Sequence, residues 1–306
     1  MTESYYSHGK LLLSGEYLVL DGATALALPT RPGQWLRVSS SADSGLRWIS
    51  KNPDGSVWFE TYFEKEAFHN PGNPEGLPSD IRGRLLFILT AALKLNPGFR
   101  EKLQGARVET LLEFPREWGL GSSSTLISNL GLWAEVNPYA LLANTMGGSG
   151  YDIASARSEG PLFYTLNPQK GPEITPAPFY PTYADQLFFV YLNQKQDSRE
   201  GIARYRDRGA PPEQLLRDVS SLSRAIPEAG SLDAFREIIE AHETLIAEIL
   251  GMETVKRKWF REYPGSIKSL GAWGGDFILA TGTPQDQEYF REKGYAVIRP
   301  YSEFIL

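Results

Sequence analysis

A glycine-rich stretch in the middle of the chain carries residue types that can bind phosphate. Six residues follow one another there: Gly119, Leu120, Gly121, Ser122, Ser123 and Ser124. An apolar run at 107–112 predicts a strand before them, and a periodic apolar segment from Leu126 predicts a helix after them. In this order, backbone N–H groups at the helix start face an anion, and a serine hydroxyl can cap the helix or bind Mg²⁺. An ordinary tight turn with a serine N-cap is the alternative, and no lysine follows the glycines as in the Walker pattern.

Two other segments place a charged residue close to glycines. Lys10 and Glu16 lie in HGKLLLSGE near the N-terminus, and Asp152 follows Ser149-Gly150. Phosphoryl transfer needs a cation near the moving phosphoryl and a group that orients the attacking oxygen, so Lys10 and Asp152 are candidates for these roles. Without other information, a lysine at a strand start is most often a solvated end residue. An aspartate in a glycine-containing loop often caps the helix that follows.

These segments together resemble the GHMP small-molecule kinases, a family that includes galactokinase, homoserine kinase, mevalonate kinase and phosphomevalonate kinase. Its phosphate loop is Pro, three variable residues and Gly-Leu-Gly-Ser-Ser, which residues 115–123 match throughout. Its first motif, Pro-Gly-Lys with Gly-Glu further on, matches at Lys10 and Glu16, although His8 replaces the proline. Its Ser-Gly-x-Asp loop matches at Ser149 and Asp152.

The third family motif, Gly-Ala-Gly-Gly-Gly, is similar to residues 271–275. Trp273 stands where the family has a glycine, and a plain glycine hairpin between two strands is the alternative. The segment Ser198-Arg199-Glu200-Gly201 resembles the helix start that contacts the acceptor in mevalonate-pathway members, although most such segments are plain N-caps. Lys195 and Arg199 beside it are either ligands of an acceptor phosphate or solvated charges.

The resemblance implies an ATP-dependent kinase that uses Mg²⁺ and acts on a small molecule. It makes Lys10 and Asp152 the catalytic residues, the loop 119–124 the ATP-binding segment and Ser123 the Mg²⁺ ligand. The implied substrate-binding residues are Glu16, Ser149, Lys195, Ser198, Arg199, Gly274 and Gly275.

Three details favour phosphomevalonate as the acceptor over mevalonate. The first motif ends Gly-Glu-Tyr, the third ends Gly-Gly-Asp, and Leu141 stands where mevalonate kinases have a Mg²⁺-binding glutamate. Asn144 stands where phosphomevalonate kinases tend to have glutamine. The alternatives are a mevalonate kinase or another kinase of the family, a diphosphomevalonate decarboxylase and a non-catalytic nucleotide-binding relative.

Composition limits the classes of function. The chain has 306 residues, 42% of them apolar, a formal net charge of −6 and no cysteine. An acidic chain disfavours a general nucleic-acid surface, and the absence of cysteine excludes disulfides and thiol catalysis. We expect a cytoplasmic protein without a signal peptide or membrane segment, either a monomer or a homodimer.

The expected fold class is α+β, with the two-lobed architecture of the GHMP kinases. The resemblance implies a ribosomal-S5-like half at 1–175, a ferredoxin-like half at 183–306 and a site in the cleft between them. The pattern also predicts a strand at Ala23–Leu28 that ends at Pro29, and a long amphipathic helix at Leu232–Leu250. Asn167–Pro181, which contains five prolines, is predicted to be an inter-domain connection.

Overall fold

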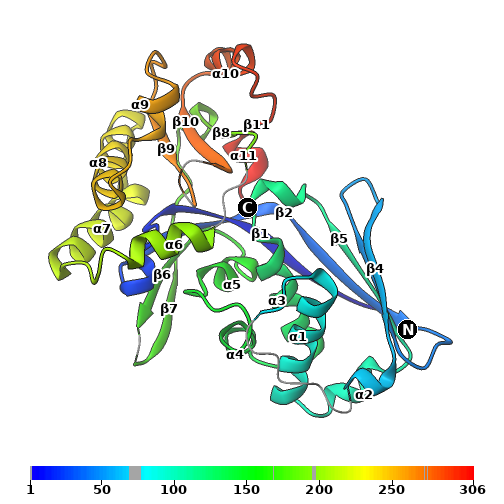
Figure 1. Cartoon of the computed structure of the whole chain (residues 1–306). Helices are drawn as coiled ribbons and strands as arrows, with labels where there is room; N and C mark the ends of the chain where they lie inside the picture. Colours follow the sequence, from blue (N-terminus) through cyan, green and yellow to red (C-terminus); the bar gives the residue numbers. More distant parts are fainter. Residues whose placement is uncertain (1, 69–76, 168, 195–197, 272, 274) are drawn as a thin grey trace. The chain divides into compact units, whose positions relative to one another are not determined.

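The computed structural model describes residues 2–68, 77–167, 169–194, 198–271, 273 and 275–306 (Figure 1). The chain divides into two compact units that alternate along the sequence. The first unit comprises Met1–Gly9, Pro32–Arg116 and Gly121–Arg157, and the second comprises Lys10–Arg31, Glu117–Leu120 and Ser158–Leu306. The expected domains, 1–175 and 183–306, are consecutive segments rather than alternating ones, and they stay a prediction.

Two long strands, β1 (Glu3–Ser14) and β2 (Ala25–Ser40), pair with each other and have residues in both units. The other strands and helices of the first unit are β3 (Leu46–Lys51), β4 (Val57–Phe63), α1 (Ile81–Leu95), α2 (Phe99–Leu103), β5 (Ala106–Leu112), α3 (Ser122–Trp133), α4 (Pro138–Ala143) and α5 (Tyr151–Ala156). Its strand order is β4-β3-β5-β2, in which only the β3–β5 pair is parallel.

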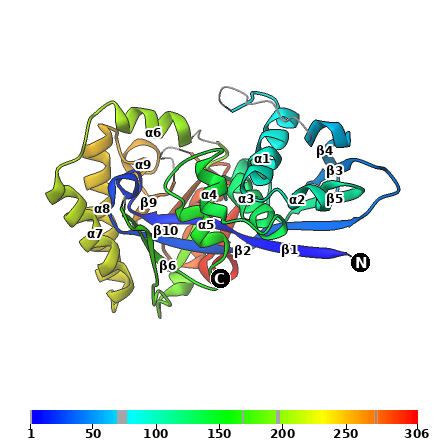
Figure 2. The ribbon, with the colours of Figure 1, turned by 90° about the horizontal axis from the view of Figure 1, so that it is seen from below.

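One hydrophobic core joins this sheet to its helices. Alternate residues of the strands, such as Val38, Trp48 and Val108, pack against apolar side chains of α1 and α3, including Leu89 and Leu130. Helix α3 contacts both α4 and α5, and the three helices lie together in Figures 1 and 2. The core therefore fixes α3, the helix that follows the glycine-rich loop.

The second unit contains the end of the first sheet and a separate four-stranded sheet. Its elements are β6 (Leu162–Asn167), β7 (Gly171–Pro176), β8 (Leu187–Tyr191), α6 (Ser198–Arg206), α7 (Glu213–Ala225), α8 (Leu232–Leu250), α9 (Val255–Trp259), β9 (Ile267–Ser269), β10 (Phe277–Thr281), α10 (Gln287–Glu292), β11 (Ile298–Pro300) and α11 (Tyr301–Phe304). β6 and β7 continue the order from β2, and the second sheet has the order β11-β8-β10-β9.

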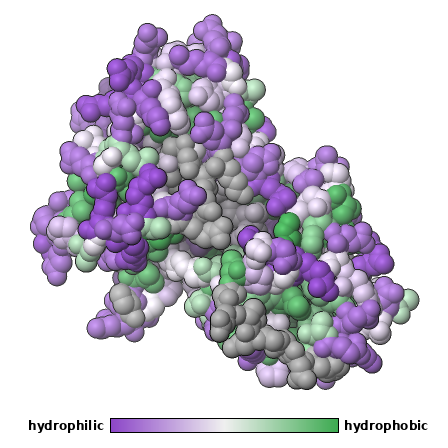
Figure 3. All heavy atoms as spheres, in the orientation of Figure 1, coloured by the Kyte–Doolittle hydropathy of each residue, from purple (hydrophilic) through white to green (hydrophobic). Residues whose placement is uncertain are grey.

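Helix α8 matches its predicted range and separates its side chains by polarity. Phe235, Ile239 and Ile246 are buried on one side, and α8 contacts α7 and β9. Hydrophilic side chains predominate on the visible face of α7, α8 and α9 (Figure 3). None of the helices in the described ranges is long and apolar enough to cross a membrane.

Two predictions about proline were wrong. Strand β2 does not end at Pro29 but continues to Ser40. It pairs with β6 up to Ala27 and with β5 from Gln34 onward. The prolines therefore lie where these two ladders need no N–H donor. The Asn167–Pro181 segment includes β7, in which Pro172 and Pro176 pair with β6 at the edge of the sheet, where proline is tolerated.

Helix α3 is also held by a buried amide. The Asn129 side chain donates through Nδ2 to the Gln34 carbonyl (2.9 Å) and accepts at Oδ1 from the Ser7 hydroxyl (2.9 Å). It thereby ties α3 to β1 and β2.

Asn129→Ala should lower the free energy of unfolding by about 1–3 kcal/mol, because it leaves buried hydrogen-bonding groups without partners. Chemical denaturation measures this loss. Leu132→Ala, an exposed position on the same helix, is the control and should change stability little. A fully stable Asn129→Ala variant would show that the amide does not hold the helix.

Candidate functional site

The backbone of the glycine-rich loop is left-handed at two of its glycines. Gly119 (φ 67°) and Gly121 (φ 85°) lie in the left-handed region, which glycine occupies at little cost. Gly121 is the N-cap of α3, so Ser122, Ser123 and Ser124 form the first turn of the helix. The N-cap is therefore not a serine, as the alternative of an ordinary tight turn with a serine N-cap would require. The start of α3 instead presents backbone N–H groups, which favour an anion.

The three serines differ in exposure. Ser123 is exposed, Ser122 is half-buried, and Ser124 is only 7% exposed. A hydroxyl that binds a ligand must be accessible, so Ser123 fits the predicted metal role better than its neighbours do. Both cofactor-binding and metal roles stay predictions.

Ser124 bonds directly to the predicted catalytic carboxylate. Its hydroxyl donates to Asp152 Oδ2 at 2.5 Å. Asp152 is half-buried in the first turn of α5, whose N-cap is Gly150 (φ 87°), so Asp152 does not cap this helix. The structure thus brings the loop residues Gly121–Ser124 and Asp152 together within the first unit, with the half-buried Ser149 just before α5.

Asp152 and Arg157 both act electrostatically on a further group, the Tyr139 phenol. Burial raises the pKa of the Tyr139 phenol to about 12, with Arg157 opposing and Asp152 adding to the shift. Arg157 is exposed, and its guanidinium donates to the hydroxyl and carbonyl of Ser128. Tyr139 was not identified as a candidate from the sequence, which has no local signal for it.

In the second unit, Lys10 contacts the other end of the loop. Lys10 lies within β1, its backbone N–H donates to the Leu120 carbonyl (3.0 Å), and its Nζ donates to the Gly119 carbonyl (3.1 Å). The Asp276 carboxylate lies close to Gly119, since a Cβ at this position would be 2.4 Å from it and would displace that side chain. Within the second unit, the structure therefore joins Lys10, the loop residues Gly119-Leu120 and Asp276 of the third motif.

Glu16 belongs to a buried charged cluster. Its Oε1 accepts a hydrogen bond from Lys268, which also lies 3.3 Å from the Glu243 carboxylate. Both Glu16 and Lys268 are at most 1% exposed. Glu16 therefore binds Lys268 in this structure, and its substrate role stays a prediction.

Burial and mutual attraction act in opposite directions in this cluster. Burial raises the pKa of Glu16 to about 7 despite the attraction of Lys268. Burial alone would lower the pKa of Lys268, but Glu16 and Glu243 outweigh it and raise that pKa. Burial keeps the pKa of His242 well below its usual 6.5, so the ring is neutral and its Nε2 accepts from the Gly15 N–H (3.0 Å).

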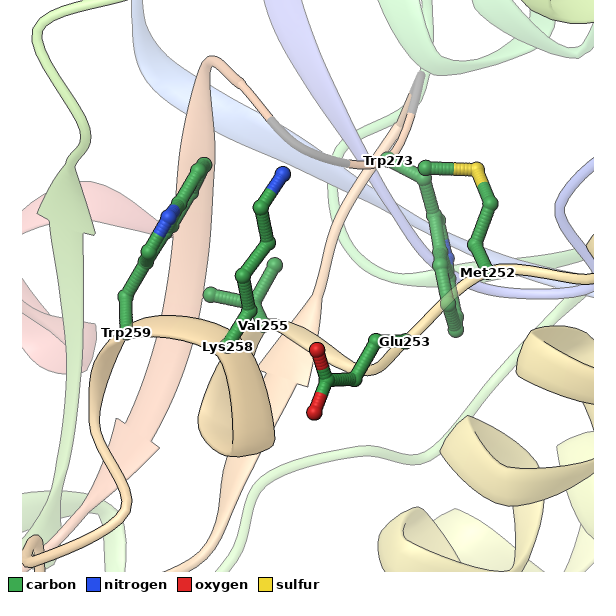
Figure 4. A pocket seen from close by; sticks show the side chains of 6 residues that line it. All are labelled: Met252, Glu253, Val255, Lys258, Trp259 and Trp273. Atoms are coloured by element: carbon green, nitrogen blue, oxygen red, sulfur yellow. The ribbon is translucent and has the colours of Figure 1, made fainter.

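Trp273, the departure in the third motif, is buried rather than projecting from the turn. It has φ 46°, is 2% exposed and packs in a cluster with Tyr17 and Tyr205. Its other side lines a cavity of about 200 Å³, with Trp259 opposite and Lys258 and Glu253 between the two indoles (Figure 4).

Several predicted substrate residues are not fully described. Gly275 is buried in the third motif, whereas Gly274 and Lys195 lie outside the described residues. Ser198 and Arg199 begin α6, but their side chains also lie outside the described part of the structure. Their roles stay predictions.

Ser123 and Asp152 carry oxygen groups of the kind that Mg²⁺ binds. Mg²⁺ prefers oxygen ligands and in kinases uses one or two protein groups together with substrate phosphates. Ser123 supplies a hydroxyl and Asp152 a carboxylate within one compact unit. Among the described residues, no group of three or more His, Cys, Asp or Glu side chains forms an all-protein metal site.

Structural comparison identifies similar folds. Phosphomevalonate kinase of Streptococcus pneumoniae, solved with phosphomevalonate and AMPPNP, superposes with a TM-score of 0.71 at 17% identity, covering 97% of this chain and 99% of that one. Mevalonate kinase of Methanococcus jannaschii gives 0.71 at 14% identity, covering 98% of each chain. Lactococcus lactis galactokinase, solved with galactose, gives 0.62 at 14% identity, covering 95% and 88%.

The fold is that of the GHMP kinases. Each match covers nearly the whole of this chain, so the expected α+β fold class is confirmed. No model of a protein family and no curated protein sequence matches the chain.

The pKa of Glu16 predicts a pH effect on stability. The folded protein holds a proton at Glu16 more tightly than the unfolded chain, so this contribution to stability is fully present below pH 4.5 and is lost as pH rises to about 7. His242 contributes the opposite slope, since the unfolded chain binds its proton more tightly. In the wild type, the Glu16 contribution to the free energy of unfolding decreases as pH rises from 4.5 to about 7, and Glu16→Gln should abolish this decrease. Parallel denaturation series for both proteins measure it, and identical pH profiles would contradict it.

Proposed function

We propose that this protein is an ATP-dependent kinase that transfers the γ-phosphoryl group of ATP to phosphomevalonate. The observation that supports this proposal most directly is at the start of α3. Ser123 is exposed there, and Ser124 donates a hydrogen bond to the Asp152 carboxylate. A positive helix end beside a fixed carboxylate suits a reaction in which phosphates bind while an attacking oxygen is oriented.

Different residues of the chain have different roles in phosphoryl transfer. The backbone N–H groups at the start of α3 bind phosphate oxygens, and Lys10 offsets negative charge on the transferred phosphoryl. Asp152 orients the attacking oxygen and accepts a proton where that oxygen carries one. Mg²⁺, held by Ser123 and the phosphates, would neutralise charge on the phosphate oxygens.

The choice of acceptor rests on the motif details and on the likeness to the Streptococcus pneumoniae enzyme, whose structure contains phosphomevalonate and AMPPNP. A phosphorylated acceptor brings about two negative charges and needs cations beyond those that bind ATP. Arg157 already donates to Ser128, so Lys195 and Arg199 are the stronger candidates for this role.

Purified protein should release ADP rapidly with phosphomevalonate and slowly with mevalonate, because the second acceptor leaves the cations without their anionic partner. A coupled ADP-release assay over mevalonate, phosphomevalonate and diphosphomevalonate, with CO₂ release monitored, measures this. Rapid turnover of mevalonate alone would overturn the acceptor but not the kinase assignment. CO₂ release from diphosphomevalonate would indicate the decarboxylase instead.

Asp152→Asn and Lys10→Met should each lower kcat by a factor on the order of 10² or more, because each removes a charge that acts in the transition state. Both variants should fold normally and bind ATP, which thermal unfolding and nucleotide titration check. Turnover at the wild-type rate in either variant would remove that residue from the catalytic set.

A further inference from the structure

Ser124 is placed differently from the serines beside it. Its side chain is 7% exposed, and its hydroxyl donates to Asp152 Oδ2 at 2.5 Å, whereas Ser123, one residue earlier, is exposed. A hydroxyl that is buried against a carboxylate is poorly placed to bind a phosphate as well. The two serines therefore do not share one role, although both belong to the loop segment 119–124.

The Asp152 carboxylate depends on this single contact. Among the described residues, Ser124 is its one hydrogen-bond partner, through Oδ2. Asp152 and Arg157 both act electrostatically on Tyr139, and the Nε and Nη2 donors of Arg157 go to Ser128. The terminal torsion of an aspartate is broad, so a fixed donor on α3 is what selects its orientation.

We propose that Ser124 is a positioning residue for Asp152 and not a ligand of the nucleotide. This inference rests on the proposed function, because it assigns Ser124 to the carboxylate that orients the attacking oxygen. Helix α3 then has two functions in the reaction. The backbone N–H groups of its first turn bind phosphate, and the buried Ser124 hydroxyl orients the carboxylate.

Loss of the hydroxyl should affect the chemical step. With Ser124→Ala the carboxylate can rotate away from the attacking oxygen, and a misplacement of about 1 Å costs up to ~10²-fold in rate. We expect kcat to fall about 10-fold to 100-fold, while the affinity for ATP and the KM for ATP stay close to the wild-type values. A phosphate ligand would show the reverse pattern.

A double-mutant cycle isolates the interaction. The proteins are wild type, Ser124→Ala, Asp152→Ala and Ser124→Ala/Asp152→Ala, assayed in single turnovers, with ATP affinity measured by titration. If Ser124 acts through Asp152, adding Ser124→Ala to Asp152→Ala should change the rate little. Ser124→Thr keeps the hydroxyl and should retain most of the activity. Ser124→Cys, a near-isosteric weak donor, gives the same comparison if the alanine variant does not fold.

Thr125→Val is the matched control. Thr125 is buried in the same helix and donates to Gln34 at 2.7 Å, so this change removes a buried hydroxyl without touching Asp152. It should lower stability without lowering kcat selectively. Rate losses that add up in the double mutant, a weakened affinity for ATP in Ser124→Ala, or an equal loss of kcat in Thr125→Val would each overturn the proposal. Wild-type protein without acceptor-dependent turnover would overturn the proposed function itself, which distinguishes the two failures.

Discussion

The fixed orientation of α3 is the constraint on which the candidate site depends. Ser128 and Asn129 present buried polar groups to one side of the helix. Asn129 bonds to Gln34 of β2, and Ser128 accepts from Ser7 of β1. Ile127, Leu130 and Trp133 bury the apolar side in the core. A helix held by both kinds of contact cannot rotate without breaking buried hydrogen bonds, so its first turn keeps its direction.

Local patterns predicted the elements whose formation depends on neighbouring residues. The strand before the glycine-rich loop and α8 match the sequence prediction, because an apolar run and helical periodicity are local signals. β7 and the full length of β2 were missed because each proline is tolerated only through the position of its strand in the sheet. That position is a tertiary property.

The same limit applies to the site. The motifs named Lys10, Ser124 and Asp152 as candidates, but the Ser124–Asp152 bond joins residues 28 apart in sequence, and the Glu16–Lys268 bond joins residues 252 apart. Lys268 had a weak signal, a lysine inside a short apolar strand next to the third motif, but its partner could not be read from its neighbours. The residue types were predictable, whereas their pairing required the fold.

The buried cluster explains why Glu16 and Lys268 belong together. An isolated charge at these depths would be strongly destabilising, and two buried ions offset this cost only with good geometry and further hydrogen bonds. Lys268 has Glu16, Glu243 and the Ser269 carbonyl as partners, while Glu243 also accepts from the Ser269 N–H. These bonds tie the first motif and α8 to the strand that leads into the third motif. Removing one charge would leave the others without compensation, so the cluster must be kept or replaced as a whole.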